Sequence, residues 1–341
     1  FTICPNPYTR EFVEEFGTYY DEDADDYQRE PFVHDVIESK SDPIYMAHTY
    51  HTKVPYKAIV QYIEHFTKKG DLVFDGFCGS GMTGVACQYS GRNSILSDLS
   101  PVSAFLTYNY NSRITEEDLF QEAIKIIEDV EKEFSWIYCT KDDNGIERTV
   151  NYTIWSDIFV CPYCDLEYVY WDRAIDHNTL KLNKEYACSG CQATISKKVS
   201  KRARVEIYDK YIDQNIVVSK QEPVFINYFI GKKNYTKKLD KYDRDLYSAI
   251  NEMDIPYAFP IDKIPEGYNT RQAMNSHGFI NVHHYFTKKN LTVLSALFTK
   301  ALKSVNKNEI LFIITSFLVK TGSKFHNIGF KGGKINLAGA M

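Results

Sequence analysis

The sequence predicts an α/β protein in which a parallel β-sheet carries a ligand site and a β-rich insertion carries a metal site. Two short apolar stretches, residues 72–74 and 94–97, flank a glycine-rich turn and a helix expected over residues 82–90. Strand, helix and strand in this order require parallel strands joined by a right-handed crossover. Later in the chain, two Cys-x-x-Cys pairs lie among short β-like stretches, a pattern typical of a small module stabilised by metal.

The composition is that of a globular protein with room for two domains, or for one domain with a large insertion. The 341 residues are 44% hydrophobic and 25% charged, which allows a sizeable core. A net charge of −5 argues against a uniformly basic nucleic-acid binder but permits a local basic face. No apolar run reaches the roughly 18 residues that a membrane span requires, and the sequence shows no signal-peptide pattern. We therefore expect a cytoplasmic protein that does not contact a membrane.

Periodicity and apolar runs predict the other elements. Apolar residues recur on one face over residues 55–66 and 116–134, which indicates two amphipathic helices. Thr115 is the expected N-cap of the second helix. The acidic run at residues 21–26 is interpreted as a solvated loop rather than a metal site. Further predicted elements are strands at residues 152–155 and 158–160 and helices at residues 289–302 and 309–319.

These elements divide the chain into four parts. An N-terminal segment with the β-α-β unit occupies residues 1–113, and a connecting helix occupies residues 114–149. Residues 150–270 form the β-rich insertion, and residues 271–341 form a helical segment that returns to the core. The sequence lacks an initiator methionine and a closing element, so we expect it to be part of a longer protein.

The glycine-rich turn, residues 75–81, reads Asp-Gly-Phe-Cys-Gly-Ser-Gly and lies where open α/β sheets bind ligands. Its glycines let the backbone approach a ligand, and the following helix offers free N–H groups. A phosphate-binding P-loop is excluded because Met82 stands where that motif requires lysine. A dinucleotide remains open, since Asp98 is suitably spaced to bind a ribose, although Asp75 would repel a pyrophosphate. Asp75 suits a cationic ligand such as S-adenosylmethionine, and a turn that binds nothing is the remaining alternative.

Residues 75–84 resemble the Asp-Pro-Phe-Cys/Ala-Gly-Ser-Gly-Thr-Thr signature of DNA amino-methyltransferases, which methylate adenine N6 or cytosine N4. Residues 52–55 are similar to the segment that closes over the methionine end of the cofactor in these enzymes, and residues 91–101 resemble their second strand with its ribose-binding acid. Gly76 replaces the usual proline. The resemblance, over residues 45–111, implies a Rossmann-like class I S-adenosylmethionine-dependent methyltransferase core, partial in this chain, with an inserted β-rich zinc-ribbon domain. It implies cofactor contacts from Thr52, Lys53, Pro55, Asp75, Phe77, Cys78, Gly79, Ser80, Gly81, Asp98, Leu99 and Ser100.

Less specific motifs extend the resemblance over most of the chain, to the adenine-specific DNA methylases that carry a zinc ribbon. These motifs are the two cysteine pairs and residues 283–291, His-His-Tyr-Phe-Thr-Lys-Lys-Asn-Leu. The resemblance implies double-stranded DNA as a partner and adenine N6, in preference to cytosine N4, as the target. It also implies a restriction-modification or phage-defence system, whose other subunits are candidate partners.

The paired cysteines are Cys161 with Cys164 and Cys188 with Cys191. Each pair brings two thiolates to one ion on a tight turn, and two such turns complete a tetrahedron around zinc. Four thiolates leave no open position, so we expect a structural metal that supplies folding free energy to a module with little core. A redox-active pair is the alternative. Cys78, in the glycine-rich turn, is interpreted as a small packing residue.

Two basic clusters are candidates for DNA contact, the alternative being solvated lysine-rich faces. Phosphate contacts by such residues would make the DNA affinity salt-dependent. His283 and His284 resemble half a metal site, but no carboxylate lies at a useful spacing, so we interpret them as structural or substrate-facing. The first cluster comprises Lys197, Lys198, Lys201, Arg202 and Arg204, and the second comprises Lys232, Lys233, Lys237, Lys238 and Lys241.

The catalytic tetrapeptide of the family, Asp/Asn/Ser-Pro-Pro-Tyr/Phe/Trp, does not occur in the sequence. It holds the amino group of a flipped-out base and stacks an aromatic ring on that base. Residues 6–8 and 100–102 each contain only one proline. We expect the motif beyond Met341, assign no catalytic residue, and expect this chain to bind cofactor without turnover. A non-catalytic module that binds S-adenosylmethionine or DNA and an NAD-dependent oxidoreductase are the alternatives.

Overall fold

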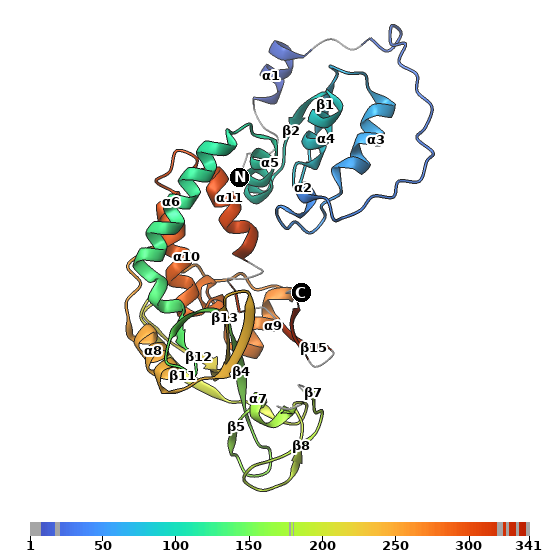
Figure 1. Ribbon diagram of the computed structural model, residues 1–341. Coiled ribbons are helices and arrows are strands. Elements are labelled where there is room, and N and C mark those ends of the chain that lie inside the picture. Colours follow the sequence, from blue (N-terminus) through green and yellow to red (C-terminus); the bar gives the residue numbers. More distant parts are fainter. Residues whose placement is uncertain are drawn as a thin grey trace.

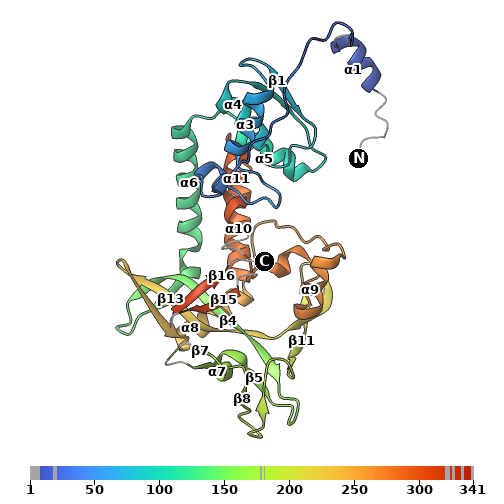
Figure 2. The same ribbon diagram turned by 90° about the vertical axis from the view of Figure 1, so that its right-hand side faces the viewer.

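The chain is elongated, with an N-terminal unit at one end and a β-rich region at the other (Figure 1). Two long helices, α6 (Glu116–Phe134) and α10 (Lys288–Ala301), run side by side between these ends (Figure 2). The computed structural model describes residues 8–17, 21–176, 179, 181–318, 323–324, 327–331 and 334–338.

The predicted β-α-β unit is present. Strands β1 (Leu72–Asp75) and β2 (Asn93–Leu96) pair in parallel, and helix α4 (Met82–Ser90) connects them. Helix α3 (Tyr56–Phe66) precedes β1, as its periodicity predicts. Helix α5 (Pro101–Asn111), which follows β2, is not predicted by the sequence pattern. The unit therefore confirms the mixed α/β class and the parallel pairing.

The two faces of this small sheet have different surroundings. Helices α3 and α4 cover one face, into which Val73 packs. On the other face, Leu72, Phe74 and Ile95 are 60%, 70% and 52% exposed. Parallel strands are usually covered on both faces, whereas none of the described elements covers this apolar face. The core on the covered side contains Tyr56, Val60, Ile63, Met82, Val85, Ala86 and Cys87.

Helix α6 leads from the N-terminal unit to the β-rich region, and α10 and α11 (Lys307–Phe317) pack along it. Ile126 of α6, Leu294 of α10 and Ile310 of α11 share one buried cluster. Helix α11 also contacts α5, so it links the two ends of the molecule. Thr115 is the N-cap residue of α6, as predicted, but its hydroxyl makes no capping hydrogen bond. The acidic first turn of α6 stabilises that end instead.

The β-rich region is built on an antiparallel sheet. Its longest strand, β4 (Glu147–Val160), pairs with β13 (Gln221–Ile230), which pairs in turn with β14 (Lys233–Lys238). The short strands that also pair with β4 are β3 (Cys139–Lys141), β5 (Glu167–Val169) and β10 (Lys201–Arg202).

The prediction of two separate strands at residues 152–155 and 158–160 is wrong, because β4 continues through Ser156 and Asp157. These polar residues suggest a break in the apolar pattern, but both have hydrogen-bond partners within the fold. Ser156 accepts a hydrogen bond from the backbone N–H of Trp171 (3.0 Å). Buried polar groups that are paired in this way do not interrupt a strand.

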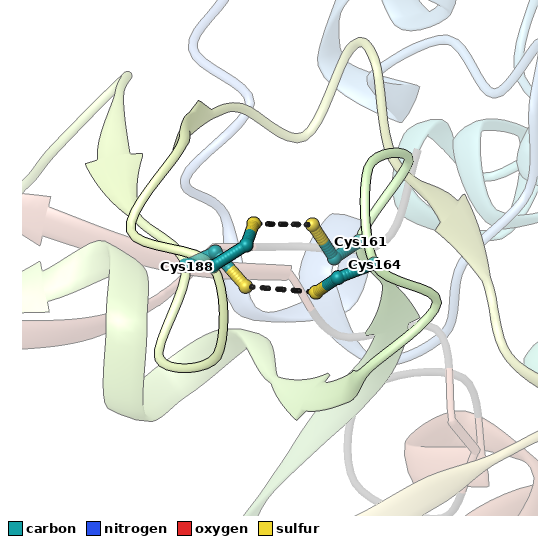
Figure 3. A group of neighbouring side chains, drawn as sticks. Cys161, Cys164 and Cys188 are labelled. Atoms are coloured by element: carbon teal, nitrogen blue, oxygen red, sulfur yellow. Dashed lines mark hydrogen bonds between the residues drawn. The ribbon is translucent and has the colours of Figure 1, made fainter.

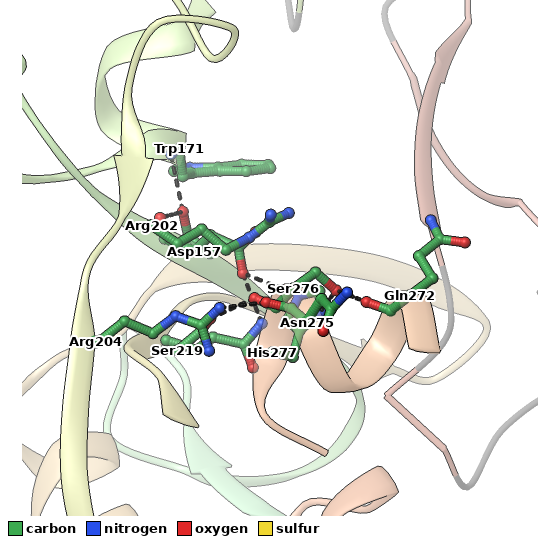
Figure 4. A network of polar contacts seen from close by, with 11 residues as sticks. Asp157, Trp171, Arg202, Arg204, Ser219, Gln272, Asn275, Ser276 and His277 are labelled. Carbon is green, nitrogen blue, oxygen red and sulfur yellow. Dashed lines mark hydrogen bonds and ion pairs between the residues drawn. The ribbon is translucent and has the colours of Figure 1, made fainter. Parts of the chain in front are cut away.

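Asp157 is the centre of a polar network that joins the sheet to helix α9 (Tyr268–His277), as Figure 4 shows. Its carboxylate accepts hydrogen bonds from Arg202 (2.9 Å) and Gln221 (2.7 Å) and lies 3.7 Å from the His277 ring. Burial alone would raise the pKa of Asp157. The nearby His277 ring, the hydrogen bond from Gln221 and the charge of Arg202 outweigh burial and hold that pKa well below its ordinary value.

The remaining elements are short. Among the described residues, no helix combines the length and the apolar character needed to cross a membrane. The acidic run at residues 21–26 is exposed and lies outside helices and strands, as predicted. The other elements are α1 (Thr9–Phe16), α2 (Pro43–Met46), η1 (Ser135–Tyr138), α7 (Tyr170–Ala174), β6 (Ile175–Asp176), β7 (Lys181–Leu182), β8 (Tyr186–Ala187), β9 (Thr194–Ile195), β11 (Arg204–Asp209), β12 (Gln214–Ser219), α8 (Lys241–Glu252), η2 (Val282–Tyr285), β15 (Asn327–Lys331) and β16 (Lys334–Ala338).

Candidate functional site

The glycine-rich turn follows β1 in a conformation that glycine adopts readily and other residues do not. Gly79 and Gly81 have φ angles of +55° and +77°, in the left-handed region. A Cβ atom on Gly81 would lie 2.7 Å from the Cα atom of Thr107 in α5, closer than such atoms pack. The turn therefore presents bare backbone at the carboxyl end of the sheet, beside the start of α4.

Asp75 and Asp98 lie at the carboxyl ends of the two parallel strands, and both carboxylates hold the turn. Asp75 accepts hydrogen bonds from the hydroxyl of Thr83 (2.6 Å) and from the backbone N–H of Phe77 (3.1 Å). Asp98 accepts hydrogen bonds from the backbone N–H groups of Gly79 (2.8 Å) and Ser100 (2.9 Å). The N–H groups of Ser100 and Gly79 lower the pKa of Asp98. Two acids that are far apart in sequence thus meet at one turn.

The other residues expected within and after the turn differ in exposure. Phe77 and Leu99 project into solvent, with 86% and 83% of their surfaces exposed. Cys78 and Ser80 are buried, and the Cys78 sulfur lies 3.3 Å from the Thr107 hydroxyl. Burial raises the pKa of the Cys78 thiol, which fits its interpretation as a packing residue. Ser100 is the N-cap of α5, where its hydroxyl accepts a backbone N–H.

The segment before α3 is fixed by Lys53. This side chain is buried, and its amine donates hydrogen bonds to the backbone carbonyls of Tyr45 and His48 and to the Tyr110 hydroxyl. The amine of Lys53 therefore orders the segment. Thr52 is exposed and Pro55, which precedes α3, is half-buried.

Tyr50 is a residue of this site that sequence reasoning missed. Its hydroxyl lies 3.0 Å from that of Ser103 in α5. A ring carbon of Tyr50 lies 3.1 Å from the position of a Cβ atom on Gly79, so the ring rests against the turn. The only sequence signal was its position just before residues 52–55.

A family model described as DNA methylase (N6_N4_Mtase) matches residues 12–107. These residues belong to the DNA methylase family. The match includes the turn and both acids of the methylase domain, and it implies S-adenosylmethionine as cofactor and DNA as substrate. No curated protein and no solved structure gives a significant match to the chain.

Outside the methylase domain, four cysteines form a cluster in the β-rich region (Figure 3). The sulfur atoms of Cys161 and Cys191 lie 3.8 Å apart, and those of Cys164 and Cys188 lie 3.6 Å apart. Four Zn–S bonds of about 2.3 Å in a tetrahedron place sulfur atoms roughly 3.8 Å apart. The spacing therefore fits the expected zinc ion, which would be held by thiolates alone.

The local backbone supports the same assignment. Each pair is followed by one residue in the left-handed region, Asp165 (φ +56°) or Gln192 (φ +60°), so the two turns have matching shapes. The backbone N–H groups of Cys191 and Gly190 lower the pKa of Cys188. At Cys164 the backbone N–H of Leu166 lowers the pKa, but burial and the neighbouring cysteine sulfurs outweigh it and raise that pKa. A thiolate is the form that binds metal. The apolar cluster beside the cysteines is small and contains Phe159, Cys161, Tyr168, Ala174, Tyr186, Cys188 and Ile195.

His283 and His284 have a carboxylate partner that the sequence did not reveal. Oδ2 of Asp209, at the end of β11, lies 2.7 Å from Nε2 of His283 and 2.8 Å from Nε2 of His284. All three side chains are buried. Such a group is a candidate metal site by composition, so the tautomers of the two rings decide its chemistry.

The hydrogen bonds of His284 argue against a metal at this group. Its Nδ1 accepts the backbone N–H groups of Ile280 and Asn281, both at 3.2 Å. Burial lowers the pKa of His284, and a neutral ring that accepts at Nδ1 carries its proton on Nε2. That proton points at Asp209 and leaves no lone pair for a metal. The group therefore ties β11 to η2, in agreement with a structural role.

The first basic cluster is divided between internal and surface roles. Arg202 donates a hydrogen bond to the carboxylate of Asp157, and Arg204 donates one to the backbone carbonyl of Asn275. Lys198 and Lys201 are exposed. In the second cluster, Lys237 is paired with Asp240 and Asp243.

Proposed function

We propose that this chain is the cofactor-binding and zinc-ribbon part of a DNA amino-methyltransferase. The observation that carries the proposal is the meeting of Asp75 and Asp98 at the glycine-rich turn, at the carboxyl ends of β1 and β2. We further propose adenine N6 rather than cytosine N4 as the target and a restriction-modification or phage-defence role. These finer assignments rest on the resemblance to zinc-ribbon adenine methylases. The four-part division of the chain remains a proposal as well.

The charges and hydrogen-bonding groups at the turn fit S-adenosylmethionine. Asp75 and Asp98 are anionic groups, which suit the sulfonium and ammonium charges and can accept hydrogen bonds from ribose hydroxyls. The same two charges would repel the pyrophosphate of NAD. Gly79 and Gly81 allow close backbone approach to the cofactor. When bound, the cofactor supplies the methyl group, and the residues of this chain hold and orient it.

Calorimetric titration of the zinc-loaded chain with S-adenosylmethionine and with NAD tests this proposal. We expect binding of the first ligand only, and Asp75→Asn should weaken it by roughly 10- to 100-fold because a charged hydrogen-bond acceptor is lost. Asp71→Asn, which lies just before β1 at the opposite end of the strand, is the matched control and should bind normally. Binding of NAD alone, or equal affinity of wild type and Asp75→Asn, would refute the assignment.

DNA contact is proposed for the exposed lysines of the first basic cluster. A protein that neutralises phosphates loses affinity with salt, with a slope of about 0.9 per phosphate contact. Lys198→Ala with Lys201→Ala should therefore reduce the slope by up to about 2. The matched control replaces Lys125 and Lys132 of α6, which are also exposed. An unchanged slope in the first double variant would remove these lysines from the interface.

We propose that the chain alone does not transfer the methyl group, since its sequence contains no Pro-Pro-aromatic tetrapeptide. Incubation with tritiated S-adenosylmethionine and duplex DNA should label no DNA above a protein-free control. Labelling by this chain would show that other residues perform the chemistry.

A further inference from the structure

We propose that Thr107 and Asn111 of α5 are positioning residues for the cofactor turn. They hold two carbonyl groups of the turn from behind, and this fixes the direction of the neighbouring N–H groups. The inference rests on the proposed function, because it concerns the same turn. Neither residue is among those that the signature of the family identifies in this sequence.

Thr107 is bonded to the first half of the turn. Its side chain is only 9% exposed, and its hydroxyl donates a hydrogen bond to the backbone carbonyl of Gly79 (3.2 Å). The Cys78 sulfur lies 3.3 Å from the same hydroxyl, so the thiol can donate to it. The hydroxyl thus joins two consecutive residues of the turn to α5.

Asn111 is bonded to the second half of the turn, one helical turn further along α5. Its Nδ2 donates hydrogen bonds to the backbone carbonyls of Gly81 (3.1 Å) and Thr107 (2.9 Å). Its Oδ1 accepts a hydrogen bond from Nε2 of Gln88 in α4 (2.9 Å). Because Nδ2 must face two carbonyl groups and Oδ1 must face an N–H donor, the side-chain amide of Asn111 has one orientation. It therefore connects the turn, α4 and α5.

The close approach of α5 also accounts for two glycines. A Cβ atom on Gly81 would lie 2.7 Å from the Cα atom of Thr107, and one on Gly84 would lie 2.4 Å from Oδ1 of Asn111. Both distances are far below van der Waals contact. Gly84 lies within a helix, where glycine is otherwise unfavourable, and its presence is explained by the space that Asn111 of α5 and Leu96 of β2 occupy, since a Cβ atom would lie 2.4 Å from each side chain.

These contacts orient the amides that a ligand would meet. The peptide unit is planar and trans, so its C=O and N–H groups point in opposite directions. Because the Gly79 carbonyl points at Thr107, the N–H of Ser80 points away from α5. The Gly81 carbonyl accepts a hydrogen bond from Asn111 and also from the backbone N–H groups of Gly84 and Val85 in α4. The N–H of Met82, at the start of α4, therefore points away from α5 as well. Preorganised donors bind a ligand without the cost of ordering them on binding.

Isosteric substitutions separate this role from simple packing. Thr107→Val keeps the shape and removes the hydroxyl, whereas Thr107→Ser keeps the hydroxyl. In calorimetric titrations of the zinc-loaded full chain with S-adenosylmethionine, we expect Thr107→Val to weaken binding roughly 3- to 10-fold. Thr107→Ser should bind within about twofold of wild type, by the same arithmetic. Thr292→Val is the matched control, since Thr292 is a buried threonine of α10 whose hydroxyl bonds the backbone of its own helix.

A second variant keeps the test decisive if Thr107→Val does not fold. Asn111→Asp retains size and the acceptor for Gln88 but replaces the donor to Gly81 with an oxygen atom, and it should weaken binding at least tenfold. If folded Thr107→Val or folded Asn111→Asp binds S-adenosylmethionine with wild-type affinity, the positioning role is overturned. This holds even if the variant has a lower unfolding midpoint, because that result would indicate a purely structural role. Absence of binding by the wild-type chain would instead refute the proposed function, and this inference would fall with it.

Discussion

Substitution of Gly81 by alanine tests how tightly the turn is enclosed. Gly81 begins α4 with φ +77°, and a Cβ atom would meet Thr107 at 2.7 Å. The left-handed conformation costs a non-glycine residue about 1–2 kcal/mol, and overpacking adds about 1–3 kcal/mol. We therefore expect Gly81→Ala to destabilise the methylase domain by about 2–5 kcal/mol.

Gly91→Ala is the matched control for the conformational part of this cost. Gly91 ends the same helix with φ +75°, and its nearest contact for a Cβ atom is the Lys69 side chain at 3.8 Å, an ordinary distance. Its substitution should cost only the conformational term, about 1–2 kcal/mol. The difference between the two variants, about 1–3 kcal/mol, isolates the contact with α5.

Amide hydrogen exchange over α4 measures this difference locally, without assuming that the whole chain unfolds in one step. Protection of α4 amides should fall roughly 5- to 150-fold further in Gly81→Ala than in Gly91→Ala. Equal protection in the two variants would mean that α5 does not press on the turn, and the argument from the two glycines would be wrong.

Three further predictions concern the β-rich region. Zinc analysis should give about one ion per chain, and chelation or Cys188→Ser should unfold the cysteine module, seen as a change in tryptophan fluorescence; a metal-free protein with unchanged fluorescence would contradict the zinc assignment. Asp157 has a lowered pKa in the folded state, so its contribution to stability is present above about pH 4 and is lost as the pH falls toward the folded-state pKa. The urea midpoint of wild type should therefore fall more steeply below pH 4 than that of Asp157→Asn, and parallel curves would refute this linkage. Asp209→Ala should cost about 2–5 kcal/mol in urea denaturation, because the buried N–H of His284 loses its acceptor and the buried His283 ring loses the same partner; it should leave the zinc content unchanged, and loss of a second metal would show that the histidine group binds one.

The sequence predicted elements with a clear periodic or positional signal and missed α5. Helix α6 matches residues 116–134 because its apolar residues recur with helical spacing, and α4 matches residues 82–90 because it connects the two strands of the β-α-β unit. Helix α5 buries two polar residues, Ser103 and Thr107, beside Leu106, so its pattern is weak. Its start signals, a serine N-cap followed by proline, were present but were absorbed into the resemblance to the second strand.

Long-range contacts account for the rest. Asp209 is 74 residues from His283, so no local pattern could pair them. Lys53 lies in the segment that resembles a cofactor-closing element, yet the fold engages its amine with nearby carbonyls. The cofactor contacts of the individual residues stay predictions. The meeting of Asp75 and Asp98 followed from the sequence alone, because parallel strands bring their carboxyl ends to one edge.

The uncovered face of β1 and β2 has a consequence for the behaviour of the protein in solution. Leu72, Phe74 and Ile95 gain free energy whenever another apolar surface excludes water from them. By mass action, anything that binds this face in the folded state raises the apparent stability of the domain. If two copies associate through this face, the midpoint of thermal unfolding rises with protein concentration, and a value measured at one dilution describes that dilution only.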